Sequence, residues 1–168
     1  MDSTKFFADI ERRSESDRSV VSSLRSALTA DRVDCHIPAM KVVEPMLHGT
    51  KPWARRHAYL AAGLWGSAVR QGDGPALKLP VALKRMANDT NKAAAIERRF
   101  VQLLDSDIEE LPFRLRQIIA LVASNRIALD WPALLDDLLR WGSPSRSVQI
   151  AWGRTFWGAA TSGGTSKN

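Results

Sequence analysis

The fold of this chain is decided by residues 129–142, LDWPALLDDLLRWG, which read as one complete helix. Asp130 offers a side-chain acceptor to the first free N–H groups, and Pro132 stands in the first turn, where no donor is needed. Gly142 is expected to end the helix in a left-handed conformation. One broad face carries the large apolar residues Trp131, Leu134, Leu135, Leu138, Leu139 and Trp141. Only other helices can cover such a face, so the stretch predicts the core of an all-α fold.

The opposite face of this helix carries Asp136, Asp137 and Arg140. Two adjacent carboxylates can serve as an acid–base pair in an enzyme. On the polar side of an amphipathic helix they are instead expected to be solvated. The helix is therefore predicted to be structural.

The rest of the chain also shows helical periodicity, and no stretch shows the sustained alternation of a strand. Residues 53–70 are small or aromatic on nearly all sides, which predicts a buried central helix. Residues 88–91, NDTN, are the best candidate for a hinge. We therefore predict an all-α chain of two small helical bundles, residues 1–88 and 89–162, with a disordered tail at 163–168. Further helices are expected at residues 6–13, 20–28, 37–47, 79–86, 93–104 and 111–123, and from 146 to about 160.

The composition is that of an ordinary globular protein, with 45% hydrophobic and 25% charged residues in a chain of 168. No apolar run approaches the roughly 20 residues that a membrane span needs. The N-terminus lacks the basic-then-apolar layout of a secretion signal. The single cysteine, Cys35, cannot form an internal disulfide, so we expect a cytoplasmic protein.

The net charge is +6, and most of the excess lies in residues 1–88. Arginine outnumbers lysine, and its planar guanidinium suits phosphate recognition. This bias favours a polyanionic partner, most often nucleic acid. The same composition is equally consistent with a basic soluble protein that has no polyanionic partner.

Catalytic and metal chemistry find little support in the sequence. There is no phosphate-binding glycine-rich loop, and no spacing of donors typical of a zinc site. Residues 106–110, SDIEE, resemble a capping box, and the acidic residues around them suit a helix N-terminus. We therefore expect no enzyme activity, no metal and no cofactor. The residues considered and rejected as metal ligands are Cys35, His36, His48 and His57. The acidic residues assigned to the helix N-terminus are Asp105, Asp107, Glu109 and Glu110.

The arginines are more informative than any catalytic motif. Taken singly, each is most simply a solvated side chain. Collected on one surface, they would form a phosphate track for a nucleic-acid strand, giving affinity without sequence readout. The arginines that suggest such a track are Arg55, Arg56, Arg98, Arg99, Arg116 and Arg146.

Aromatic residues point to protein contacts. Phe113 lies off the core stripe of its helix, and Ile150 and Trp157 lie opposite the apolar face of the last helix. A helix side that the fold cannot cover marks a partner interface, unless the helix is packed on both sides. The apolar face itself consists of Val148, Trp152, Phe156 and Ala159.

These residues resemble the CasB-type small subunit of the type I-E CRISPR surveillance complex, Cascade. The match rests first on residues 129–132, LDWP, leading to Trp141-Gly142. It also rests on residues 97–104 (ERRFVQLL), on Leu115-Arg116, and on residues 37–39 (IPA) followed by 43–45 (VEP). The resemblance spans most of residues 20–145.

The resemblance implies a two-domain, all-helical subunit without catalytic activity. It implies a homodimer that lies against the backbone and large subunits of the complex and near the guide RNA. It further implies that basic residues stabilise the R-loop, chiefly the displaced non-target DNA strand. The basic positions that match the family are Arg25, Arg56 (with His57), Arg85, Arg98, Arg99 and Arg116.

One departure concerns the segment after Trp141-Gly142, which can be richly basic in the family. Here residues 143–145, SPS, intervene and only Arg146 remains as a candidate contact. Two other functions stay open from the residues alone. One is a helical scaffold acting only through protein–protein contacts. The other is a helix-turn-helix regulator, which lacks an obvious recognition helix here.

Overall fold

The computed structural model describes residues 1–30, 32–68, 72, 74–89 and 91–159. This part of the chain contains nine α-helices, two 3-10 turns and no strand, which confirms the predicted all-α class. The predicted tail at 163–168 lies outside the described residues. The elements are α1 (Ser3–Ser16), α2 (Ser19–Ala27), η1 (Val33–Cys35), α3 (Ile37–Val43), η2 (Glu44–Met46), α4 (Pro52–Ser67), α5 (Leu79–Asp89), α6 (Ala93–Asp105), α7 (Leu111–Ser124), α8 (Trp131–Arg140) and α9 (Ser147–Trp157).

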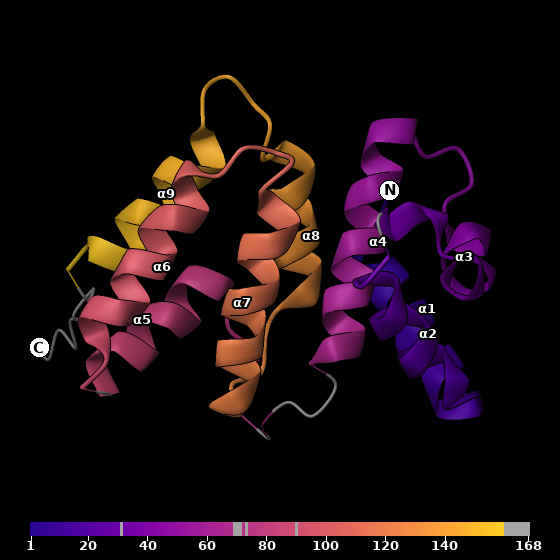
Figure 1. Cartoon of the computed structure of the whole chain (residues 1–168), viewed down its shortest axis with the longest axis horizontal. Helices are drawn as coiled ribbons and strands as arrows, with labels where there is room; N and C mark the ends of the chain where they lie inside the picture. Colours follow the sequence, from indigo (N-terminus) through magenta and orange to yellow (C-terminus); the bar gives the residue numbers. More distant parts are fainter. Residues whose placement is uncertain (31, 69–71, 73, 90, 160–168) are drawn as a thin grey trace, which may run out of the picture.

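The helices form two groups with α4 and α8 side by side between them (Figure 1). On one side α1, α2 and α3 surround α4, and on the other α5 packs against α6, α7 and α9. Helix α8 contacts α1 and α4 from the first group and α9 from the second. The division at residue 88 stays a prediction. The principal contacts of α5 favour a boundary before this helix rather than after it.

Helix α4 is the central helix of the first group, as its sequence predicts. It is buried without interruption from His57 to Gly66. Helix α2 lies very close to it, because a Cβ at Gly66 would stand 3.0 Å from the Arg25 backbone nitrogen and 3.1 Å from the Val21 carbonyl oxygen. A larger residue at this point would push the two helix backbones apart.

Helix α8 begins as expected and ends differently. The Asp130 carboxylate accepts a hydrogen bond from the Ala133 N–H at 3.0 Å, which confirms the predicted cap. Gly142, however, is not left-handed, so that expectation was wrong. Ile108 packs over the helix end instead: a Cβ on Gly142 would lie 3.0 Å from its Cδ1, a contact that a shift of this partly exposed side chain would relieve.

The two aspartates of α8 are not simply solvated, which corrects a second expectation. Asp136 accepts a hydrogen bond from the Ser3 hydroxyl of α1. Asp137 accepts one from Nε1 of the buried Trp152 of α9 at 2.7 Å. The polar face of α8 therefore joins the two helix groups. Sequence periodicity alone could not reveal this, because both partners belong to other helices, and Ser3 is 133 residues away.

We expect Gly66→Ala to lower the free energy of unfolding. Gly66 lies one residue before the end of α4, where alanine gains at most about 1 kcal/mol in helix propensity. Overpacking against the α2 backbone costs about 1–3 kcal/mol, so a net loss of up to about 2–3 kcal/mol is expected. Urea denaturation measures the change. Gly74→Ala is the control, because nothing lies within 4 Å of its added Cβ. A stabilised Gly66→Ala variant would contradict the close packing of α2 on α4.

Trp131 is expected to be the costliest residue of α8 to truncate. It is 4% exposed, packs against Phe7 with ring centroids 6.2 Å apart, and its indole N–H finds no partner in the described part of the chain. The ring thus acts as apolar volume, and Trp131→Ala should cost about 3–5 kcal/mol through cavity formation. Thermal denaturation tests this, with Trp53→Ala as control because Trp53 is 55% exposed. An unchanged melting temperature for Trp131→Ala would refute its role in the core.

Candidate nucleic-acid interface

The seven arginines predicted to bind nucleic acid do not form one cluster. They lie on five helices and one loop, and two of them, Arg56 and Arg116, line a common cavity. Arg25 belongs to α2, Arg56 to α4, Arg85 to α5, Arg98 and Arg99 to α6, Arg116 to α7, and Arg146 to the loop before α9.

Arg56 and Arg116 meet at a cavity of about 200 Å³ between α4, α7 and the end of α2. Arg32, which sequence reasoning missed, also lines it. We call this space the junction cavity, because both helix groups contribute to its walls. Its lining residues are Leu28, Ala30, Arg32, Val33, Arg56, Leu60, Glu109, Pro112, Phe113 and Arg116.

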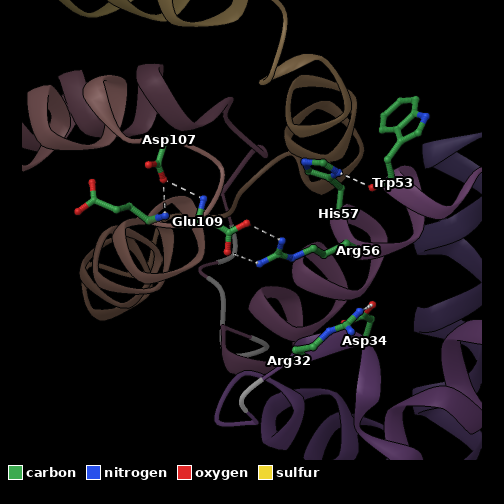
Figure 2. A network of polar contacts seen from close by, with 8 residues as sticks. Arg32, Asp34, Trp53, Arg56, His57, Asp107 and Glu109 are labelled. Carbon is green, nitrogen blue, oxygen red and sulfur yellow. Dashed lines mark hydrogen bonds and ion pairs between the residues drawn. The ribbon is translucent and has the colours of Figure 1, made fainter.

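The Arg56 guanidinium forms a two-point ion pair with Glu109 from the turn before α7. Nη1 lies 3.1 Å from Oε1 and Nη2 lies 3.3 Å from Oε2 (Figure 2). These hydrogen bonds raise the pKa of Arg56 and lower the pKa of the Glu109 carboxyl. On the adjacent segment, Arg32 Nη2 donates to Asp34 Oδ2 at 2.9 Å. The cavity therefore holds more than one guanidinium, partly neutralised by carboxylates.

Two of the predicted arginines are oriented by backbone carbonyls. Arg116 Nη1 donates to the Leu28 carbonyl, which ties α7 to the end of α2. Arg25 Nε donates to the Gly66 carbonyl at 3.2 Å. Because a guanidinium carries five N–H donors, each retains others for a phosphate. Each residue thus has a structural contact without losing its capacity to bind an anion.

Arg85, Arg98 and Arg99 are exposed on the neighbouring helices α5 and α6. Arg85 lies 3.7 Å from Asp89, a loose contact on one helix face. Neither Arg98 nor Arg99 forms an ion pair with a described residue. This doublet is therefore the pair of predicted contacts that is most available to a partner.

Arg146 contacts both a backbone carbonyl and a carboxylate of α6. Its Nη2 donates to the Leu104 carbonyl at 2.6 Å and lies 3.6 Å from Asp105. Its backbone is left-handed, with φ of 50°, a conformation that costs energy for a residue with a side chain. The side chain holds the loop before α9 against α6.

The turn before α7 is not a capping box, which corrects a further expectation. The Ser106 hydroxyl donates back to the Leu103 carbonyl at 2.7 Å. Asp107 Oδ1 accepts from the backbone N–H groups of Glu109 and Glu110, at 2.9 and 2.8 Å (Figure 2). Asp107 therefore holds the turn that places Glu109 opposite Arg56. The Ser106-to-Glu109 spacing suggested a cap at Ser106, but α7 begins four residues later than that cap would place it, at Leu111 with Glu110 as the N-cap residue.

In the described part of the chain, no group of three or more His, Cys, Asp or Glu side chains is placed to bind a metal ion. His57 is buried, and its Nδ1–H donates to the Trp53 carbonyl at 2.9 Å (Figure 2). Cys35 is exposed. Among the described helices none is long and apolar enough to cross a membrane.

An apolar groove of about 570 Å³ lies between α6 and α9. Ile150 and Trp157 are 48% and 50% exposed there, so of the two alternatives left open by the sequence, the one in which this side of α9 is not fully covered agrees with the structure. The groove is a candidate protein interface, separate from the junction cavity. Its lining residues are Val101, Leu104, Asp105, Pro144, Ser145, Arg146, Gln149, Ile150, Gly153, Arg154 and Trp157.

Known proteins are similar to this chain in both sequence and fold. Residues 20–157 match the family described as CRISPR-associated protein Cse2. A Cse2 protein of Thermus thermophilus is 40% identical over 126 residues, covering 74% of this chain and 70% of the relative.

Solved structures agree with the sequence match. A Cse2-family crystal structure from Thermus thermophilus has a TM-score of 0.80 at 33% identity and covers 94% of this chain and 98% of that one. CasB of M. ruber has a TM-score of 0.74 at 30% identity, with 94% and 93% covered. A chain of a CRISPR RNA-guided surveillance complex shares the fold, with a TM-score of 0.77 at 20% identity and 92% of each chain covered.

His57, next to Arg56, should make stability depend on pH. Burial lowers its pKa below the usual 6.5, so the native state holds it neutral. As pH falls below about 6.5, His57 binds a proton in the unfolded chain but not in the native state, so the free energy of unfolding falls. At higher pH this contribution vanishes.

Urea denaturation at pH 7.5 and pH 5.5 tests this expectation. The loss of stability on acidification should be smaller in His57→Gln than in the wild type. His48→Gln is the control, because His48 is exposed and its replacement should leave the difference unchanged. Equal losses in the wild type and His57→Gln would show that His57 is not held neutral.

Proposed function

This chain belongs to the Cse2 family of CRISPR-associated proteins, and from that membership we propose that it is a non-catalytic small subunit of a type I-E Cascade complex. The match agrees with the resemblance recognised in its sequence. We further propose that its basic surface binds nucleic acid without sequence preference. The observation that carries this second proposal is the convergence of Arg32, Arg56 and Arg116 on one cavity between the two helix groups.

The physical role would be to keep a DNA strand unpaired. R-loop formation exchanges one duplex for another at nearly balanced free energy, so contacts to the displaced strand can tip the balance. Guanidinium groups supply such contacts through phosphate, whatever the base sequence. The displaced non-target strand is therefore the proposed ligand, with guide RNA as a further phosphate-bearing neighbour.

The arginines proposed to contact nucleic acid differ in the ion pairs and hydrogen bonds that they already make within the chain. Arg98 and Arg99 project from α6 without an ion pair to a described residue, and Arg56 is held toward the junction cavity by an exposed carboxylate. Arg116 and Arg25 keep donors beyond those used on backbone carbonyls. Arg85 and Arg146 are proposed as outer contacts, since both already lie near acidic partners.

A second candidate function is a scaffold that acts only through protein contacts. The exposed groove between α6 and α9 favours it, because large apolar side chains in water mark partner surfaces. The two functions are compatible in one subunit. We propose that partners within the complex, the backbone and large subunits or a second copy of this chain, cover apolar surface of this kind.

The decisive measurement is the salt dependence of single-strand binding. A variant with Arg56→Gln, Arg98→Gln and Arg99→Gln should bind a labelled DNA oligonucleotide more weakly at every salt concentration. Each lost phosphate contact should reduce the log–log salt slope by about 0.7, so three contacts reduce it by about 2. In the assembled complex the same variant should shorten the lifetime of the R-loop.

The control carries the same loss of charge elsewhere. Lys5→Gln, Arg12→Gln and Arg18→Gln alter exposed residues of α1 and the turn after it. If both triple variants reduce binding and slope equally, only net charge matters and the proposed contacts are misplaced. If the first variant binds like the wild type while the chain still joins the complex, the scaffold function is favoured.

A further inference from the structure

Phe113 is an exposed aromatic ring at the junction cavity. It lies in the first turn of α7 and is 51% exposed, although most large apolar side chains of this chain are buried. The Arg114 guanidinium carbon lies 5.6 Å from the ring centroid, which fixes one side of the ring by a cation–π contact. The ring therefore faces the cavity at low cost in side-chain entropy.

The other wall of the cavity is cationic and ordered. Arg116 is anchored by the Leu28 carbonyl, and Arg56 is oriented by Glu109 through two hydrogen bonds. Ordered guanidinium groups lose little freedom when they bind a phosphate. An aromatic ring beside such groups is the combination that binds one nucleotide of a single strand: the base stacks and the phosphate is neutralised.

We infer that the junction cavity is a subsite for one unstacked nucleotide, in which Phe113 stacks on the base and Arg56 and Arg116 bind the adjoining phosphate. The inference rests on the proposed function and adds to it a preference for single strands. In a duplex the faces of the bases are covered by their neighbours. Only a separated strand can offer a base to Phe113.

Glu109 gives this subsite a built-in competitor. Its carboxylate occupies two of the five donors of Arg56 and neutralises its charge, so it competes with a phosphate for this guanidinium. Its side chain is 76% exposed, so water can replace Arg56 around it when a strand arrives. The Glu109 carboxylate thus sets a threshold: a lone phosphate must displace it without help, whereas a nucleotide adds the stacking of its base.

The first test uses the full chain with two oligonucleotides of equal length, oligo-dT and the same backbone with abasic sites. The wild type should bind oligo-dT at least about fivefold more tightly, the low end of the contribution of one stacked base. Phe113→Leu should bind both oligonucleotides as the wild type binds the abasic one. Phe113→Tyr should restore the preference. Circular dichroism shows that each variant is folded.

The second test measures the competitor. Glu109→Gln should tighten binding of oligo-dT more than Glu110→Gln does. Both variants remove one negative charge from the same turn, but only Glu109 pairs with Arg56. Equal tightening by the two variants would overturn the role of Glu109.

The outcomes separate this inference from the proposed function. If Phe113→Leu keeps the wild-type preference for oligo-dT, the stacking subsite is wrong while strand binding stands. If it binds both oligonucleotides like the wild type but no longer joins the complex, Phe113 is a protein contact and the inference fails. If the wild type binds neither oligonucleotide at low salt, the proposed nucleic-acid function fails together with the subsite.

Discussion

The arrangement of the two helix groups depends on the contacts that α8 makes through both its apolar and its polar face. Its apolar face is buried, and its polar face is tied to α1 through Asp136 and to α9 through Asp137. A buried indole N–H whose acceptor is lost keeps its full desolvation cost, so the bond from Trp152 is expensive to break. Helix α8 thereby fixes α1 and α9 relative to each other.

The shape of the candidate interface depends on this arrangement of the two helix groups. The junction cavity takes Arg32 and Arg56 from one helix group and Phe113 and Arg116 from the other. None of these side chains could form the cavity unless the two groups were fixed relative to each other. Stability and the proposed strand binding would thus be linked through the same helix, although α8 itself contributes no residue to the cavity.

Much of the fold could be predicted from local patterns, while the site could be predicted only in part. The Asp130 cap, the buried α4 and the exposed Phe113 and Trp157 follow from capping chemistry and helical periodicity. The role of Asp136, the packing of Ile108 over Gly142 and the pairing of Arg56 with Glu109 depend on residues distant in sequence. Arg32 stands in a connector without periodicity, so no sequence signal marked it.

The bond between Ser3 and Asp136 spans 133 residues, which has a consequence for synthesis on the ribosome. Helices α1 and α4 emerge before α8, the helix that covers part of their surface, which begins more than 60 residues after α4 ends. Contacts this distant in sequence slow folding, and apolar surface left open meanwhile invites aggregation. The nascent chain must therefore wait, partly uncovered, until residues 131–140 leave the exit tunnel. Its first half is expected to depend on chaperones during that interval.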